Sequence, residues 1–66
     1  MNGTIVRLNE PQGFGFINGE DGTDRFFHHS ALRGVRFADL RQNMRVTFDP
    51  TVGERGPRAE EVRVVA

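Results

Sequence analysis

Apolar residues at every second position, in short stretches separated by turn signals, limit how this chain can fold more than any other feature. A period of two places alternate side chains on opposite faces of a strand, and no stretch shows the period of an amphipathic helix. Turn-forming residues such as Pro11, Asp21-Gly22 and Pro50 separate the stretches. The five expected strands are Thr4–Leu8, Phe14–Ile17, Arg25–His29, Met44–Pro50 and Ala59–Ala66.

The length of the chain then restricts how these strands combine. With 66 residues the chain forms one domain, residues 1–66, with a small core. Five short strands closed into a barrel lose their exposed edges and enclose that core. We therefore expect an all-β fold, a five-stranded antiparallel barrel, with one helical turn at Ser30–Leu32 and a turn-rich loop over 51–57. The expected core residues are Ile5, Ile17, Phe27, Val46, Phe48, Val62 and Val64.

Composition excludes several classes of function. Cysteine is absent, so the chain has no thiol nucleophile and no thiolate metal site. All nine basic residues are arginine, and nine acidic residues balance them to a net charge of zero. Arginine can bind phosphate through its planar fork and can stack on bases. Neither a signal peptide nor a run of membrane-spanning length is visible. We expect a cytoplasmic monomer that does not bind membranes.

The stretch "QGFGFI", residues 12–17, places two rings on one face of a strand. Phe14 and Phe16 are two residues apart, as are Phe26 and His28 in the next strand. If Asp21-Gly22 forms the hairpin turn, the four rings gather on one outer face and Phe27 points inward. A barrel of this size cannot bury all six phenylalanines of the chain. Exposed rings beside glycines, which leave room for a ligand, are typical of surfaces that stack unpaired bases.

"QGFGFI" and "DRFFHHS" resemble the two signatures of the cold-shock domain family, "KGFGFI" and "VFVHFS". "GTIV" at 3–6, "SAL" at 30–32 and "RGPRAEEV" at 55–62 also match, the last resembling the family's "RGPQAANV". The resemblance therefore extends over nearly the whole chain. It implies a barrel of the oligonucleotide/oligosaccharide-binding (OB) type that binds single-stranded RNA or DNA in the manner of an RNA chaperone. It also implies that the protein needs no cofactor and is not an enzyme.

The resemblance assigns binding roles residue by residue. The stacking positions of the family fall on Phe14, Phe16, Phe26 and His28. The aromatic residue of the long loop falls on Phe37, and a basic contact near the last turn falls on Arg55. Phe37 has the alternative of plugging an open end of the barrel, and Arg55 that of an exposed turn residue.

Departures from the family pattern bear on affinity. Arg7 replaces a tryptophan, Leu8 a phenylalanine and His29 the phenylalanine that ends the second signature. Gln12 and Val6 each replace a lysine. Arg7 can stack its guanidinium on a base and reach a phosphate, and His29 and Gln12 remain candidate contacts. We expect binding weaker than that of a typical member, with a changed sequence preference.

Other interpretations of these residues remain open. The lost tryptophan and lysines also fit a divergent barrel that binds another protein and has weak or no affinity for nucleic acid. A metal site is disfavoured, because adjacent strand residues such as His28 and His29 point to opposite sides and no further ligands accompany them. The acidic residues Glu20, Asp21 and Asp24 fit turn chemistry better than catalysis, since exposed carboxylates lack the burial that separates their pKa values.

Overall fold

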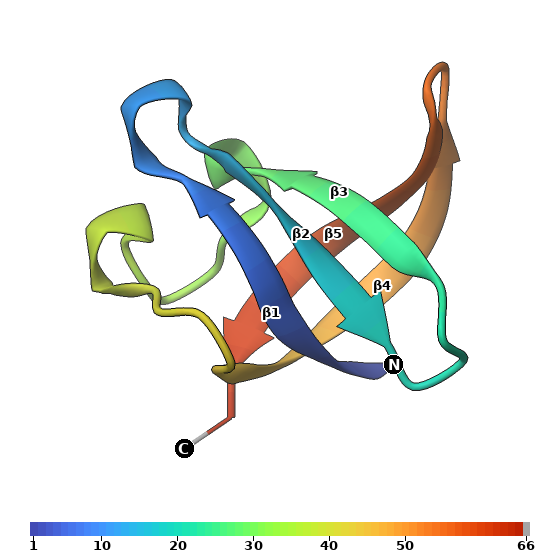
Figure 1. Cartoon of the computed structure of the whole chain (residues 1–66), viewed down its shortest axis with the longest axis horizontal. Helices are drawn as coiled ribbons and strands as arrows, with labels where there is room; N and C mark the ends of the chain where they lie inside the picture. Colours follow the sequence, from blue (N-terminus) through green and yellow to red (C-terminus); the bar gives the residue numbers. More distant parts are fainter. Residues whose placement is uncertain (66) are drawn as a thin grey trace.

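The computed structural model describes residues 1–65 and shows five strands that close into a barrel (Figure 1). The strands are β1 (Asn2–Asn9), β2 (Phe14–Gly19), β3 (Asp24–His28), β4 (Arg45–Gly53) and β5 (Gly56–Val64). Three single-turn 3-10 helices lie in the connections: η1 (Glu10–Gln12), η2 (His29–Ala31) and η3 (Phe37–Asp39). The strand order around the barrel is β1-β2-β3-β5-β4. The expected all-β barrel is confirmed. Ala66, the expected end of the last strand, lies outside the described residues.

Neighbouring strands are antiparallel except where the barrel closes. β3 and β5 pair in parallel through a single position, Phe26 with Arg58. A second, isolated parallel bridge joins Leu32 to Val62 beyond the end of β3. The barrel is therefore closed by few backbone contacts at β3 and β5. Its other four strand pairs form longer antiparallel ladders.

Strands β2 and β3 form the expected hairpin, and its register groups the residues expected on the outer face. Phe16 lies opposite Phe26, and Phe14 lies opposite His28. Gly19 and Thr23 close the turn through a hydrogen bond of 2.9 Å from the Gly19 amide to the Thr23 carbonyl. Cross-strand partners share a face of the sheet. This register therefore brings the outer rings of the two strands together.

A β-bulge at Val6 turns Arg7 outward. Ile5 pairs with Ile17 of β2, but the next pair is Arg7 with Phe16, so Val6 is an extra residue. In a regular strand Ile5 and Arg7 would share the inner face. The bulge shifts the register by one residue and places Arg7 on the outer face beside Phe16.

Strands β4 and β5 are longer than the sequence predicts, and their hairpin extends beyond the barrel (Figure 1). The expected loop over 51–57 is wrong, because β4 runs to Gly53 and β5 begins at Gly56. Pro50 does not end β4. It pairs with Ala59 of β5, whereas β1 pairs with β4 only at residues 45–47, so the missing N–H of Pro50 faces an edge without a partner strand.

The core contains most of the residues expected from the sequence. Its largest fully buried side chains are Phe27, Phe48, Ile5, Ile17, Val46 and Val62. Val64 was expected there as well but is only half-buried, packed against the core at the end of β5. Among residues 1–65, three further hydrophobic residues of the core were not predicted: Ala31, Leu40 and Ala59.

Gly15 and Gly13 fill backbone and packing needs and do not clear space for a ligand. Gly15 faces the barrel interior, where a Cβ atom would lie 2.8 Å from the ring of Phe27 and 2.5 Å from the carbonyl oxygen of Arg7. Gly13 ends η1 with a left-handed φ of 72°, a conformation that glycine adopts without strain. The expectation that these glycines let a ligand approach the backbone is therefore wrong.

An ion pair between the buried Arg25 and the exposed Asp21 lies at the turn between β2 and β3. The guanidinium of Arg25 lies 5.6 Å from the ring centroid of Phe48 and donates hydrogen bonds of 3.0 and 2.7 Å to the carboxylate of Asp21. These bonds, together with a hydrogen bond from the Thr23 amide, lower the pKa of Asp21 to about 2. Asp21 therefore has a structural role in the turn, as expected.

Candidate functional site

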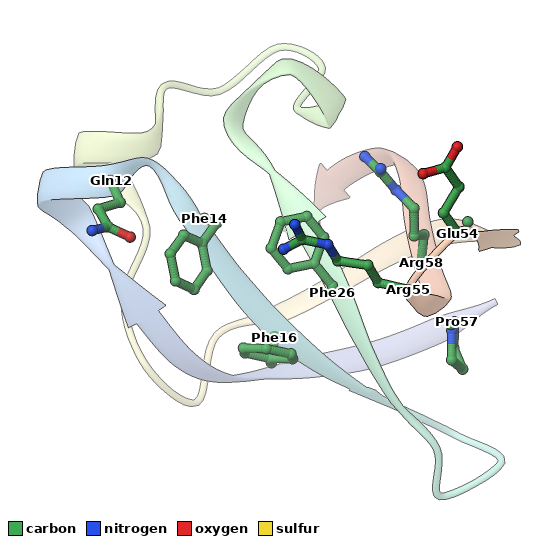
Figure 2. Close-up of a pocket in the computed structure, with 10 residues that line it drawn as sticks. Gln12, Phe14, Phe16, Phe26, Glu54, Arg55, Pro57 and Arg58 are labelled. Carbon is green, nitrogen blue, oxygen red and sulfur yellow. The ribbon is translucent and has the colours of Figure 1, made fainter.

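Three phenylalanine rings gather on the outer face of β2 and β3 (Figure 2). The ring centroids of Phe14 and Phe26 are 5.5 Å apart, and those of Phe16 and Phe26 are 5.9 Å apart. The rings of Phe14 and Phe16 meet edge to face at 6.3 Å. All three side chains are half-buried, whereas Phe27, which follows Phe26 in β3, is fully buried. We call Phe14, Phe16 and Phe26 the ring cluster.

The ring cluster forms one wall of an open cleft of about 1000 Å³. The β4–β5 hairpin supplies the opposite wall with Glu54, Arg55, Pro57 and Arg58, and Gln12 lies at the end next to Phe14 (Figure 2). Arg55 is exposed on the tight turn, and its side chain extends toward the rings. The cleft thus combines aromatic faces with two guanidinium groups.

Arg7 lies beside the cleft as a consequence of the bulge. It pairs across the strands with Phe16 and is exposed. A guanidinium at this position adds a planar, positively charged surface next to the ring cluster. The position assigned to Arg7 by resemblance is therefore part of the same outer face, although strict alternation along β1 would have placed it inside.

The two histidines lie together, contrary to expectation. β3 ends at His28, and His29 begins η2, so the chain turns and the two rings lie 4.1 Å apart. Their predicted orientation to opposite sides is therefore wrong. The Ser30 amide donates a hydrogen bond of 3.3 Å to Nδ1 of His28, which restrains this ring, and His28 lies opposite Phe14 in the β2–β3 pairing. Among residues 1–65, no three His, Cys, Asp or Glu side chains are grouped so that they could hold a metal ion.

Phe37 lies apart from the ring cluster. Its half-buried ring is 6.1 Å from that of Phe27 and packs against the core, as in the alternative of a barrel plug. It also lines a second cleft of about 370 Å³ together with His29 and Gln12. Because Gln12 borders both clefts, the two surfaces are contiguous. Phe37 therefore lies on a surface that adjoins the cleft of the ring cluster at Gln12.

Arg58 is a basic residue of the cleft that sequence reasoning missed. Its guanidinium carbon lies 5.4 Å from the ring centroid of Phe26, its backbone partner in β3. Sequence alone could have indicated its importance, because Arg58 stands where the motif "RGPQAANV" has glutamine. The pairing of β3 with β5 that places it beside Phe26 is not visible in the sequence.

A closed five-stranded barrel with this strand order and aromatic residues on the faces of β2 and β3 is an OB-fold. Comparison with known proteins identifies the family more closely. A family model described as the 'Cold-shock' DNA-binding domain matches residues 1–65. The chain belongs to the cold-shock domain family.

Individual relatives agree with this assignment. Cold shock protein 2 of Lactiplantibacillus plantarum is 48% identical over 62 residues, which are 94% of this chain and 94% of that protein. Major cold shock protein CspA of Pseudomonas aeruginosa is 41% identical over 65 residues, 98% of this chain and 94% of that one. The solved structure of drosophila Unr CSD456 superposes with a TM-score of 0.71 at 26% identity and covers 98% of this chain but 26% of that chain. None of the helices among residues 1–65 is long and apolar enough to cross a membrane.

Proposed function

We propose that this protein binds single-stranded RNA or DNA by stacking unpaired bases on the ring cluster. The observation that carries the proposal is that Phe14, Phe16 and Phe26 form one wall of an open cleft and are only half-buried, although a core lies directly beneath them. Every base has a π-face, so such a surface binds many sequences. Membership of a family described as DNA-binding supports the same function.

The charged residues around the rings fit a nucleic-acid strand that crosses the cleft. Arg55 and Arg58 lie on the hairpin side, and Arg7 lies beside Phe16. Their guanidinium groups can contact phosphates while bases face the rings. The path continues past Gln12 to His29 and Phe37, which adds further contacts for a longer strand. We assign the nine residues named from the sequence to this path, together with Arg58.

The proposed activity is binding without catalysis. The type of ligand also indicates where in the cell the protein acts. A protein that binds single-stranded RNA with little sequence preference can keep the RNA unpaired, as an RNA chaperone does. The curated relatives are bacterial proteins, and bacterial nucleic acids lie in the cytoplasm. We therefore infer that the protein acts there, as a monomer, and requires no cofactor.

Titration with short single-stranded oligonucleotides of matched RNA and DNA sequence tests the proposal. Phe16→Ala and Phe26→Ala should each weaken binding by about 1–3 kcal/mol, or about 5- to 150-fold in Kd. Val65→Ala is the matched control, because it shortens an exposed apolar side chain outside the cleft. Circular dichroism and thermal unfolding would show that each variant is folded. Unchanged affinity in both phenylalanine variants would reject stacking, and no binding by the wild type would favour the protein-interaction alternative.

A further inference from the structure

Arg58 and Phe26 form a unit at the point where the barrel closes. They are the paired residues of β3 and β5, and the guanidinium carbon lies 5.4 Å from the ring centroid. Both residues line the cleft that holds the ring cluster (Figure 2). A base stacked on Phe26 therefore has the guanidinium of Arg58 within reach of its edge. Arg58 thus places a hydrogen-bonding group beside the ring cluster, whose rings can only stack on bases.

The side chain of Arg58 is held in place from two sides. Its aliphatic stem packs so closely on the backbone of Gly53 that a Cβ atom there would overlap Cδ of Arg58. Its Nη2 lies 3.3 Å from Oε2 of Glu60. Both residues of this ion pair differ from the motif "RGPQAANV", in which glutamine and alanine occupy positions 58 and 60. An arginine restrained in this way loses less conformational entropy on binding a ligand.

The guanidinium retains donors for a ligand. Its Nε is buried and has no hydrogen-bond partner among residues 1–65. An unpaired buried donor is costly, and an acceptor that reaches it removes the cost. A guanidinium carries five N–H donors, and the ion pair with Glu60 joins a single nitrogen to a single oxygen. With the stem held against Gly53, rotation of the half-exposed guanidinium alone would present two adjacent donors to a base.

We propose that Arg58 gives the Phe26 position a preference for guanine, an inference that rests on the proposed function. Guanine offers two adjacent acceptors, O6 and N7, which arginine binds in a bidentate manner. Adenine has an amino donor in place of O6 and would oppose the guanidinium with a like group. The ring cluster stacks any base, and Arg58 selects among the bases stacked on Phe26.

Affinity measurements with a single replaced base test this assignment. The ligands are an oligothymidylate and the same strand with its central thymidine replaced by dG, dA or dC. We expect the wild type to bind the dG strand about 5- to 150-fold more tightly than the dA strand. Arg58→Gln should remove the preference for dG or turn it toward dA, because glutamine pairs with adenine in a bidentate manner. Any general loss of affinity in this variant should already appear with the oligothymidylate. Arg58→Lys, which keeps the charge but not the planar fork, should weaken the preference for dG.

Arg55→Gln is the matched control, since it removes the other guanidinium of the cleft and should weaken all strands alike. Equal wild-type affinity for all four strands, a preference for dA or dC, or a dG preference that survives in both Arg58 variants would overturn the inference but leave stacking intact. Absence of binding to every strand would instead overturn the proposed function. Fluorescence titration at low salt distinguishes these outcomes.

Discussion

Replacing Gly15 by alanine should destabilise the barrel, although alanine is ordinarily the better residue within a strand. The added Cβ atom would lie 2.5 Å from the carbonyl oxygen of Arg7 and 2.8 and 2.9 Å from two carbons of the Phe27 ring. The carbonyl belongs to the backbone of the neighbouring strand β1 and cannot rotate away. The ring of Phe27 is fully buried and has no empty space to enter. Strand β1 or the ring must therefore shift.

The size of the effect follows from two opposing terms. Overpacking by one methyl group costs about 1–3 kcal/mol. The smaller conformational freedom of alanine in the unfolded chain returns about 0.4–1 kcal/mol. The free energy of unfolding should therefore fall by about 1–2 kcal/mol. For a domain of this size, each kcal/mol lowers Tm by about 4–8 °C, so we expect a decrease of about 4–16 °C.

Urea and thermal unfolding followed by circular dichroism measure this change. Gly22→Ala is the control, because a Cβ there meets nothing within 4 Å but the φ of 82° is left-handed, so only backbone strain acts. Adding Phe27→Leu to Gly15→Ala removes the crowded ring carbons, and the double variant should be more stable than the two separate effects predict. A Gly15→Ala protein as stable as the wild type would refute the packing explanation.

Three further results are expected. Asp21→Asn should make stability depend less on pH in acid. The pKa of the Asp21 carboxyl is about 2 in the folded protein, below its ordinary value of 3.8, so the ionised carboxylate stabilises the fold above pH 3.8 and this contribution is lost as the pH falls toward 2. The urea midpoint of the wild type should therefore decline more steeply than that of the variant between pH 3.8 and pH 2. Arg55→Gln should lower the slope of log K against log salt for single-stranded DNA by about 0.7 if Arg55 contacts one phosphate, and an unchanged slope would exclude that contact. Phe37→Ala should reduce the unfolding free energy by about 1–3 kcal/mol, because the ring packs against the core beside Phe27; a fully stable variant would show that Phe37 serves the surface alone.

Much of the fold followed from local pattern. Alternation and a strong turn signal predicted the β2–β3 hairpin and the outward position of rings such as Phe16 and Phe26. Inward positions such as Ile5 and Phe27 followed from the same alternation. These predictions succeeded because both depend on contacts between residues close in sequence.

Features that depend on distant contacts were missed. The bulge at Val6 arises from the pairing of β1 with β2 and breaks the alternation that sequence reasoning assumes. Pro50 signals a strand end locally, but it lies on an edge where its missing donor costs nothing. The role of Arg58 depends on the parallel contact of β3 with β5, which joins residues far apart in the chain. The small residues Ala31 and Ala59 carry no pattern that identifies them as core.

The central claim is that bases lie against the rings of Phe14, Phe16 and Phe26. Nuclear magnetic resonance of the complex with a short single strand tests this most directly, through nuclear Overhauser effects between ring protons and base protons. We expect contacts from all three rings to bases, with none from the buried ring of Phe27. A tight complex in which these rings show no contact with bases, and in which the protein contacts only sugars and phosphates, would contradict the account.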